Sequence, residues 1–490
     1  MMDARKAAER LVDHALSCGL LNSEDRTWAY NTALAHLEGA DLEAGGVADE
    51  DLAANVMGLI MPRPSEVAAT FWKLHAQSPR MATDYLYRLS CDANYVRTEA
   101  IARNVCWEAQ TQWGVLQITI NRTKPEKDPR DIARLAAPKV QAASDAVDYP
   151  ACRLCVENEG YWGRPEGAPG GEYPPRGNLR IVPMRLGGQQ WGMQYSPYAY
   201  YNEHCIAMNS LHIPMHVDRS CLQNLFDFVD LLPHYFIGSN AGLPVVGGSI
   251  LNHDHFQGGR CRFPMDDAPR IDSFEVPGFP NVDAAVLKWP VSVLSLRCED
   301  RCELIDCADH ILETWSTYDD AEVGIVSITN GVPHNAVTPI LRKDAGVYTL
   351  NMALRNNITS EEHPLGVFHP HEELHHIKKE NIGLIEVMGL AILPPRLAPE
   401  LAAVADALVA NKGLPHEELL ALLEQNPLTR GHAAWACEVA ARRSEMNADN
   451  ASEILKQEVG CVFAQVLETT GVFKWDDAGR GALRRFLDAL

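Results

Sequence analysis

The chain lacks the long apolar segment that a membrane-spanning helix requires. No apolar run approaches the roughly 18 residues needed to cross a bilayer. The N-terminal residues Met1–Lys6 lead into an amphipathic stretch, not into the apolar core of a signal peptide. These absences argue against a membrane or secreted protein and indicate a cytoplasmic one.

Positive charge is also scarce. Lysine and arginine number 43 against 65 aspartates and glutamates, which gives a net charge of −22. Non-specific binding to nucleic acid or to an anionic membrane depends on basic patches, so neither partner is expected. An anionic substrate would need local arginine, lysine, histidine or backbone N–H groups to offset this global field.

A dense cysteine framework is missing as well. The 13 cysteines are odd in number and scattered, so most are expected to be buried thiols. Hydrophobic content of 46% and charged content of 22% are typical of globular proteins, and 490 residues exceed one ordinary domain.

Hydrophobic periodicity predicts four regions. Residues 1–110 are expected to be helical, 111–265 to form a catalytic α+β half, 266–395 a second α+β half, and 396–490 a helical C-terminal region. The predicted fold class is α+β, with mostly antiparallel sheets and packed helices. Among the expected elements are strands over 114–121, 181–186, 191–195, 204–208, 282–287, 291–296, 322–329, 336–341 and 347–354, and helices over 128–137, 218–232 and 302–318.

The centre of the chain carries the most informative pattern. His253, His255 and Gln257 alternate between Gly247-Gly248 and Gly258-Gly259. Residues two apart on a strand share a face, so two imidazoles and an amide would line one surface. The pattern could also be a polar strip on an edge strand or two hydrogen-bonded core histidines, but the bracketing glycines favour a functional site.

Phosphoryl chemistry suits these residues. A neutral imidazole is a competent nucleophile near pH 7, and its attack on phosphorus would give a labile phosphoramidate. Gln257 could hold a phosphoryl oxygen through its amide N–H. Backbone N–H groups of the glycine-rich segment, which includes Gly248 and Ser249, could add further donors.

A metal site is a second possibility. Cys152 and Cys155 form a Cys-x2-Cys pair, and His204 and His253 follow downstream. Two thiolates and two imidazoles would make a tetrahedral zinc site. The alternative is a pair of unrelated buried cysteines.

Further polar residues are candidates for substrate binding. A second histidine-rich stretch over 368–380 includes His369, His371 and Lys378, and could bind a metal or close over a phosphate. Arg176, Asn178 and Arg180 precede a predicted strand, and could face a phosphate or a nucleobase. Arg355 is another basic candidate. A solvated loop and ordinary surface arginines are the alternatives.

Together these residues resemble the class II galactose-1-phosphate uridylyltransferases. The stretch from Leu243 to Gly259 is similar to that family's signature almost position for position. The resemblance covers about residues 80–400. Other similar stretches are Ile118–Asn121 with Lys124–Pro129, Gln194–Tyr198, Asn202–Cys205, Pro233–Asn240, His334-Asn335, Leu354–Asn357 and Glu362–Gly366.

The chain departs from the family at two positions of this region. Gly242 stands where the family usually has Asp, and Asn252 where it usually has Ser or Ala. Neither lies in the His-x-His-x-Gln core, so these departures concern substrate preference more than the reaction.

The resemblance implies a histidine-triad-like fold, a homodimer and a uridylyltransferase of galactose metabolism. By analogy with class I enzymes, His255 would attack the α-phosphorus of UDP-glucose and release glucose 1-phosphate. Galactose 1-phosphate would then take up the uridylyl group and leave as UDP-galactose. Gln257 would orient the phosphate, and Asn240 lies in a similar stretch expected to bind substrate.

The analogy with class I enzymes also concerns cofactors. In those enzymes a Cys-x2-Cys pair, a separate histidine and the first histidine of the motif bind zinc. Cys152, Cys155, His204 and His253 follow that order in this chain. A structural zinc and no organic cofactor are therefore expected.

Two other functions fit the same residues. A nucleotide-sugar hydrolase or phosphorylase would use the same nucleophile with water or phosphate as acceptor. A non-catalytic UDP-sugar-binding protein would bind without exchange, although it would have no need of an aligned nucleophile. An N-acetylated hexosamine phosphate could replace galactose 1-phosphate as acceptor.

Overall fold

The computed structural model describes residues 4–38, 47–122, 149–164, 171–248 and 250–490. The helix expected over 128–137, the stretch Lys124–Pro129 and Ser249 lie outside them. Across the described ranges, no helix has both the length and the apolar character needed to cross a membrane.

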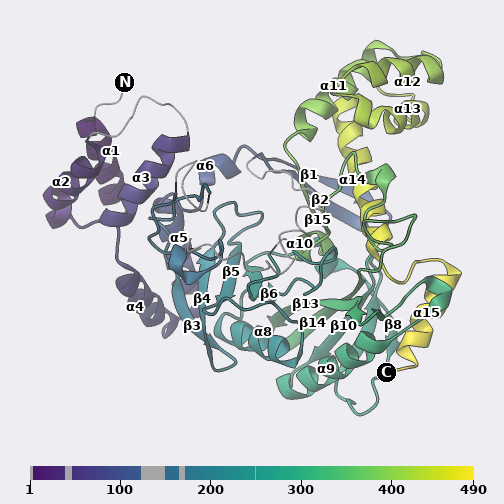
Figure 1. Cartoon of the computed structure of the whole chain (residues 1–490), viewed down its shortest axis with the longest axis horizontal. Coiled ribbons are helices and arrows are strands. Elements are labelled where there is room, and N and C mark those ends of the chain that lie inside the picture. The colour runs from purple at the N-terminus through teal and green to yellow at the C-terminus, as the bar shows by residue number, and fades with distance from the viewer. Residues whose placement is uncertain (1–3, 39–46, 123–148, 165–170, 249) are drawn as a thin grey trace.

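A ten-stranded sheet forms the centre of the molecule (Figure 1). Every neighbouring pair of its strands is antiparallel, which confirms the predicted α+β class with mostly antiparallel sheet. In order across the sheet the strands are β3 (Val182–Leu186), β4 (Gln189–Tyr195), β5 (Cys205–Asn209), β7 (His255–Gly259), β6 (Phe236–Gly238), β13 (Asn335–Asp344), β14 (Val347–Asn356), β10 (Val293–Cys298), β9 (Asp283–Leu287) and β8 (Arg270–Phe274).

This order divides the sheet into two halves, each made of neighbouring strands from one continuous part of the sequence. All strands from β3 to β6 come from residues 111–265, and all strands from β13 to β8 come from residues 266–395. The halves meet where β6 pairs with β13, through Ile237 opposite Leu341 and Gly238 opposite Ile340. Strand β7, which carries His255 and Gln257, is separated from this seam by β6 alone.

Two helices cover one face of the sheet, α8 (Arg219–Leu231) and α9 (Arg301–Thr317) (Figure 1). The Asp218 carboxylate accepts a hydrogen bond from the backbone N–H of Cys221 and caps α8. The expected apolar face of α8 is buried through Leu222, Leu225, Phe226 and Val229. This packing fixes the helix against the sheet.

A second sheet of three strands lies beside the first. It contains β1 (Val105–Thr111), β2 (Gly114–Ile120) and β15 (Leu390–Leu393), with β15 parallel to β2. The prediction of helix up to residue 110 is wrong over β1, because Val105–Thr111 pairs with β2 along its whole length. The strand predicted over 322–329 is also wrong in most of its length: a short helix spans Ala321–Val323 and only Ile328–Thr329 is extended.

Helices form both ends of the chain, as expected (Figure 1). The N-terminal region contains α1 (Ala4–Ser17), α2 (Arg26–Leu37), α3 (Val47–Ile60), α4 (Pro64–His75), α5 (Pro79–Asp92) and α6 (Thr98–Ile101). The C-terminal region contains α11 (Leu397–Ala410), α12 (His416–Gln425), α13 (Ala433–Arg442), α14 (Ala451–Thr470) and α15 (Asp477–Leu487). A short helix, α10 (Leu384–Val387), precedes β15.

Candidate active site and metal centre

Strand β7 holds two of the candidate site residues, His255 and Gln257. It is paired on both sides, with β5 and with β6. A Cβ atom on Gly258 would lie 2.5 Å from the carbonyl oxygen of Phe236, so only glycine lets the two backbones come so close. The strand is therefore a rigid support for both side chains.

Within the described part of the chain, Nδ1 of His255 is anchored and Nε2 has no hydrogen-bond partner. Its Nδ1 lies 2.8 Å from the backbone carbonyl oxygen of His253, an arrangement in which Nδ1–H donates and Nε2 keeps its lone pair. Burial lowers the pKa of His255 to about 4, which keeps the ring neutral at pH 7. The ring therefore has the neutral, Nδ1-protonated form that a nucleophilic histidine requires.

A cavity of about 320 Å³ opens beside His255. His255, Gln257 and His204 line it together with two arginines, Arg153 and Arg176. The rest of its wall includes Tyr95, Gln194, Ser196, Tyr198, Tyr200, Asn240, Gly247, Gly248, Ile250, Glu380, Asn381 and Glu386. Such a mixture of aromatic, amide and charged groups is suited to a polar ligand with ring moieties.

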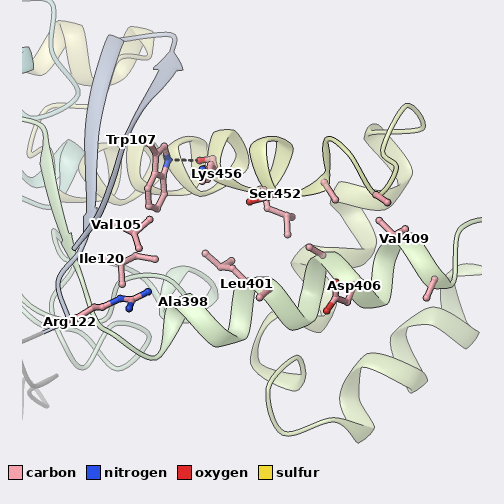
Figure 2. Close-up of a pocket in the computed structure, with 16 residues that line it drawn as sticks. Val105, Trp107, Ile120, Arg122, Ala398, Leu401, Asp406, Val409, Ser452 and Lys456 are labelled. Carbon is pink, nitrogen blue, oxygen red and sulfur yellow. Dashed lines mark hydrogen bonds between the residues drawn. The ribbon is translucent and has the colours of Figure 1, made fainter. Parts of the chain in front are cut away.

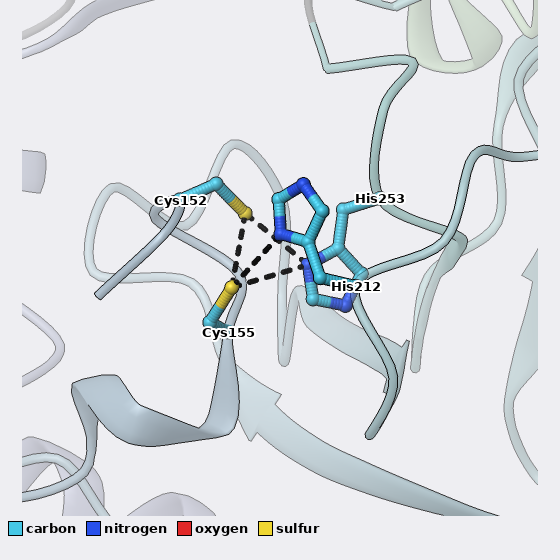
Figure 3. Close-up of side chains that lie close together, drawn as sticks. All are labelled: Cys152, Cys155, His212 and His253. Carbon is cyan, nitrogen blue, oxygen red and sulfur yellow. Dashed lines mark hydrogen bonds between the residues drawn. The ribbon is translucent and has the colours of Figure 1, made fainter. Parts of the chain in front are cut away.

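Two cysteines and two histidines converge immediately before β7 (Figure 3). Sγ of Cys152 lies 3.1 Å from Nδ1 of His253, and Sγ of Cys155 lies 3.1 Å from Nδ1 of His212. The two sulfur atoms are 3.6 Å apart. A tetrahedral zinc ion would place such atoms about 3.4–3.8 Å from one another, given its usual bond lengths. The observed spacings of 3.1 and 3.6 Å are within a few tenths of an ångström of that range, so the four residues could hold a metal ion.

The orientation of His253 supports the same interpretation. Its Nε2 lies 2.8 Å from the carbonyl oxygen of Asn209, so Nε2–H donates to the backbone and Nδ1 directs its lone pair at the thiols. Metal-bound histidines usually have their second nitrogen held in this way. The hydrogen bond between the thiols lowers the pKa of Cys152 to about 7 and raises that of Cys155 to about 11.

The fourth member of this cluster differs from the prediction, which named His204. Strands β5 and β7 are antiparallel, with Met208 opposite His255 and Cys205 opposite Gly258. Extending that register puts residue 210 beside His253, whereas His204 lies about 20 Å away along the strand at about 3.4 Å per residue. His212 is near the correct end of β5, and His204 contacts Gln257 instead.

Three of the predicted substrate-binding residues line the cavity: Arg176, Asn240 and Gly248. Arg176 also stacks near Tyr95, with its guanidinium 6.0 Å from the ring centre. Oδ1 of Asn240 accepts a hydrogen bond of 2.9 Å from the backbone N–H of Leu384. This contact fixes the position of the Asn240 amide beside the ligand space.

Six others do not line this cavity, although the structure describes all of them: Asn178, Arg180, Arg355, His369, His371 and Lys378. Arg180 donates to the carbonyl oxygens of Gly58 and Pro62, and so ties α3 and α4 to the sheet region. Lys378 is buried between Glu380 and Glu386, at 3.0 Å from each carboxylate. Its charge holds two carboxylates that do line the cavity.

Among the residues that the prediction did not name, His212 and Arg153 bear most directly on the chemistry. His212 completes the metal cluster, and the strand register would have indicated it. Arg153 lines the cavity from within the Cys-x2-Cys loop, so the loop that holds the thiols also supplies a cation. The position of Arg153 between the two cysteines was its only sequence signal.

A larger cavity, of about 520 Å³, lies elsewhere, between strands β1 and β2 and helices α11 and α14 (Figure 2). Its wall is mostly apolar, with Arg122, Asp406 and Lys456 among its charged residues. Among the described residues that line it, none is a histidine or a cysteine. Of these two cavities, the one beside His255 is therefore the one that histidines line.

Two family models match the chain. The model described as "Galactose-1-phosphate uridyl transferase, N-terminal domain" matches residues 3–214, and the corresponding C-terminal domain model matches residues 228–434.

Similar proteins of the same description occur in several bacteria. The galactose-1-phosphate uridylyltransferase of Clostridium acetobutylicum is 45% identical over 94% of this chain and 89% of its own length. The Bacillus subtilis protein is 48% identical over 90% and 82%, and a Streptococcus pneumoniae protein is 42% identical over 98% of both chains. Among solved structures, yeast Ap4A phosphorylase is 12% identical with a TM-score of 0.33, over 64% of this chain and 89% of its own.

Proposed function

The chain belongs to the galactose-1-phosphate uridylyltransferase family, with transferase activity in galactose metabolism, and from that premise we propose a covalent mechanism centred on His255. The uridylyl group of UDP-glucose passes to Nε2 of His255 and then to galactose 1-phosphate. The observation that supports this proposal is the anchored Nδ1 of a neutral, buried His255 at the edge of a cavity.

In the first half of the reaction, the Nε2 lone pair attacks the α-phosphorus of UDP-glucose. A phosphorus–nitrogen bond forms, and the bond from that phosphorus to the bridging oxygen breaks. Glucose 1-phosphate leaves with the bonding electrons. The His255 ring becomes positively charged, and the carbonyl oxygen of His253 stabilises its Nδ1–H through the hydrogen bond already present.

In the second half, a phosphate oxygen of galactose 1-phosphate attacks the same phosphorus. The phosphorus–nitrogen bond breaks, its electrons return to Nε2, and UDP-galactose leaves. No proton needs to be added or removed in either half. The neutral state of His255 is therefore restored after each cycle.

Charge around the phosphates has to be supplied locally, because the chain as a whole carries −22. Arg153 and Arg176 bring guanidinium groups to the cavity wall, and the amide of Gln257 supplies an N–H donor close to His255. Such preorganised donors stabilise charge that develops on phosphoryl oxygens in the transition state.

Cys152, Cys155, His212 and His253 form the ligand set that we assign to a structural zinc ion. Bound there, the metal would crosslink the Cys-x2-Cys loop to the residues that flank β5 and β7. His253 is two residues before the nucleophile, so this crosslink would fix the start of the catalytic strand.

A labelling experiment tests the covalent step. The chain is incubated with UDP-glucose carrying radioactive phosphorus at the α-position, without acceptor, and is then denatured and separated from free nucleotide. Label is expected on the wild-type chain and not on the His255→Ala variant. An unlabelled wild-type chain that still exchanges the two sugars would contradict the covalent mechanism.

The acceptor and the assembly have separate tests. Galactose 1-phosphate is the expected acceptor, and a panel of hexose 1-phosphates that includes N-acetylated hexosamine phosphates compares it with the alternative.

A homodimer, which the family resemblance implies, predicts twice the chain mass in sedimentation equilibrium; a single chain mass would contradict it.

A further inference from the structure

We propose that His204 is a positioning residue for this reaction, because its Nε2–H holds Oε1 of Gln257 and turns the amide N–H of Gln257 toward the phosphoryl group on His255. This inference rests on the proposed function of His255. It gives His204 a role different from the zinc ligand that spacing alone suggested.

The contact itself is direct. Nε2 of His204 lies 3.2 Å from Oε1 of Gln257. His204 immediately precedes β5, and Ile206 is opposite Gln257 across the β5–β7 pair. His204 is two residues before Ile206, so it is a diagonal neighbour of Gln257 on the same face of the sheet. His204 and Gln257 also line the same cavity as His255.

The His204 ring has little freedom to move. It is only 2% exposed, and its centre lies 4.4 Å from the ring of Tyr201 and 5.4 Å from that of Tyr200. The hydroxyl of Tyr201 donates to the carbonyl oxygen of Gly258 at 3.1 Å. Tyr201 therefore contacts both the His204 ring and the strand that carries Gln257.

Burial also decides where the ring proton lies. It lowers the pKa of His204 to about 3, so the ring is neutral and has one N–H. Within the described residues, Nδ1 is buried without a hydrogen-bond partner. A proton on Nδ1 would bury an unpaired N–H, which is costlier than a bare lone pair; a proton on Nε2 instead makes a hydrogen bond to Gln257.

This proton position determines which end of the amide faces the substrate. The oxygen and nitrogen of a primary amide point in different directions from one carbon, so an Oε1 held by His204 leaves Nε2 directed elsewhere. Nε2 of Gln257 has no partner among the described residues, and it is not one of their buried unpaired atoms. It is therefore available to donate to a phosphoryl oxygen, whereas the flipped amide would present an oxygen and repel it.

Two substitutions test the role. His204→Met removes the donor at similar volume, and is expected to lower kcat about 10- to 100-fold with KM for UDP-glucose within about twofold. His204→Gln keeps an N–H near the same place and is expected to recover kcat to within about threefold of wild type. His310→Met, which removes a partly buried histidine from α9, is the matched control and should leave kcat unchanged.

A double-mutant cycle separates positioning from packing. In a Gln257→Ala background, His204→Met is expected to cause no further loss of kcat, because the amide it positions is already gone. Losses that multiply would overturn the proposal, as would a His204→Gln variant as slow as His204→Met, or a His204→Met variant as fast as wild type.

If His204→Met fails to fold, a measurement on the wild-type chain tests the proposal in place of the cycle. Nitrogen-15 NMR with histidine labelling, assigned by comparison with His204→Gln, reports which ring nitrogen is protonated. An Nε2–H ring at pH 7 is expected, and an Nδ1–H ring would overturn the proposal. Radioactive label on the wild-type chain with unaltered kcat in His204→Met would reject only the positioning role, while absence of label would reject the covalent mechanism itself.

Discussion

The two ends of the β5–β7 pair place histidines in different chemical settings. At one end, His212 and His253 face two thiols; at the other, His204 faces the amide of Gln257. His255 lies between these groups with its Nδ1 bound to the backbone. The comparison shows that histidines of one strand pair differ in the groups that their ring nitrogens contact: thiols, a side-chain amide, or a backbone carbonyl.

The largest expected effect on activity comes from removing His255, which lies between the two ends of the β5–β7 pair. His255→Ala deletes the nucleophile, so exchange between UDP-glucose and galactose 1-phosphate is expected to fall by about 10⁴-fold or more. Metal content should stay as in wild type, since His255 is not in the cysteine–histidine cluster. A variant that retains more than about a tenth of wild-type exchange would contradict the assignment.

The amide end is expected to have the next largest effect on catalysis. Gln257→Ala removes one donor to the phosphoryl group and should lower kcat by about 10²- to 10³-fold. The purified variant should keep its full metal content, because Gln257 is not in the cysteine–histidine cluster. Steady-state kinetics and metal analysis of the same sample test both statements, and loss of metal would show that the two ends are not independent.

A matched pair of variants distinguishes the two candidate ligands. His212→Gln should weaken zinc binding by at least about tenfold, since three ligands remain in place of four. His204→Gln should leave zinc affinity unchanged. Competition with a chromophoric chelator measures both, and the reverse result would restore His204 as the ligand.

The smallest expected effect is on acid stability. The pKa of His204 in the folded chain is about 3, below its ordinary value of 6.5, so protonation favours the unfolded chain. Above about pH 6.5 the ring is neutral in both the folded and the unfolded chain, so its burial does not depend on pH. As the pH falls below about 6.5, the unfolded chain takes up the proton first and the folded chain loses stability.

His204→Gln removes this titrating group. The difference in the free energy of unfolding between variant and wild type should be about 1–2 kcal/mol more favourable to the variant at pH 5 than at pH 7.5. Urea unfolding at the two pH values measures the difference. An equal stability difference at both would show that His204 is not buried in neutral form.

Sequence reasoning found the residues that lie close together in the chain. His253, His255 and Gln257 share one strand motif, and Cys152 and Cys155 share one loop, so local spacing was enough to relate them. His204 and His212 lie at opposite ends of β5, and choosing between them required the pairing of β5 with β7. That pairing is a tertiary fact that spacing does not contain.

The same limit applies to the arginines and to the secondary structure. Arg176 and Arg180 lie four residues apart, yet Arg176 lines the cavity while the backbone carbonyls near α3 and α4 bind Arg180. The amphipathic helix α8 was predictable from its apolar face alone. Strand β1 was not, because its conformation depends on pairing with β2.

The seam between β6 and β13 has a consequence for how the chain emerges from the ribosome. The strands from β3 to β7 are all synthesised before β13, so the outer edge of β6 stays unpaired until residue 335 and its neighbours arrive. A long bare edge invites pairing with other nascent chains. Because β6 contains only Phe236–Gly238, the exposed template is about three residues long, and the short strand limits aggregation during that interval.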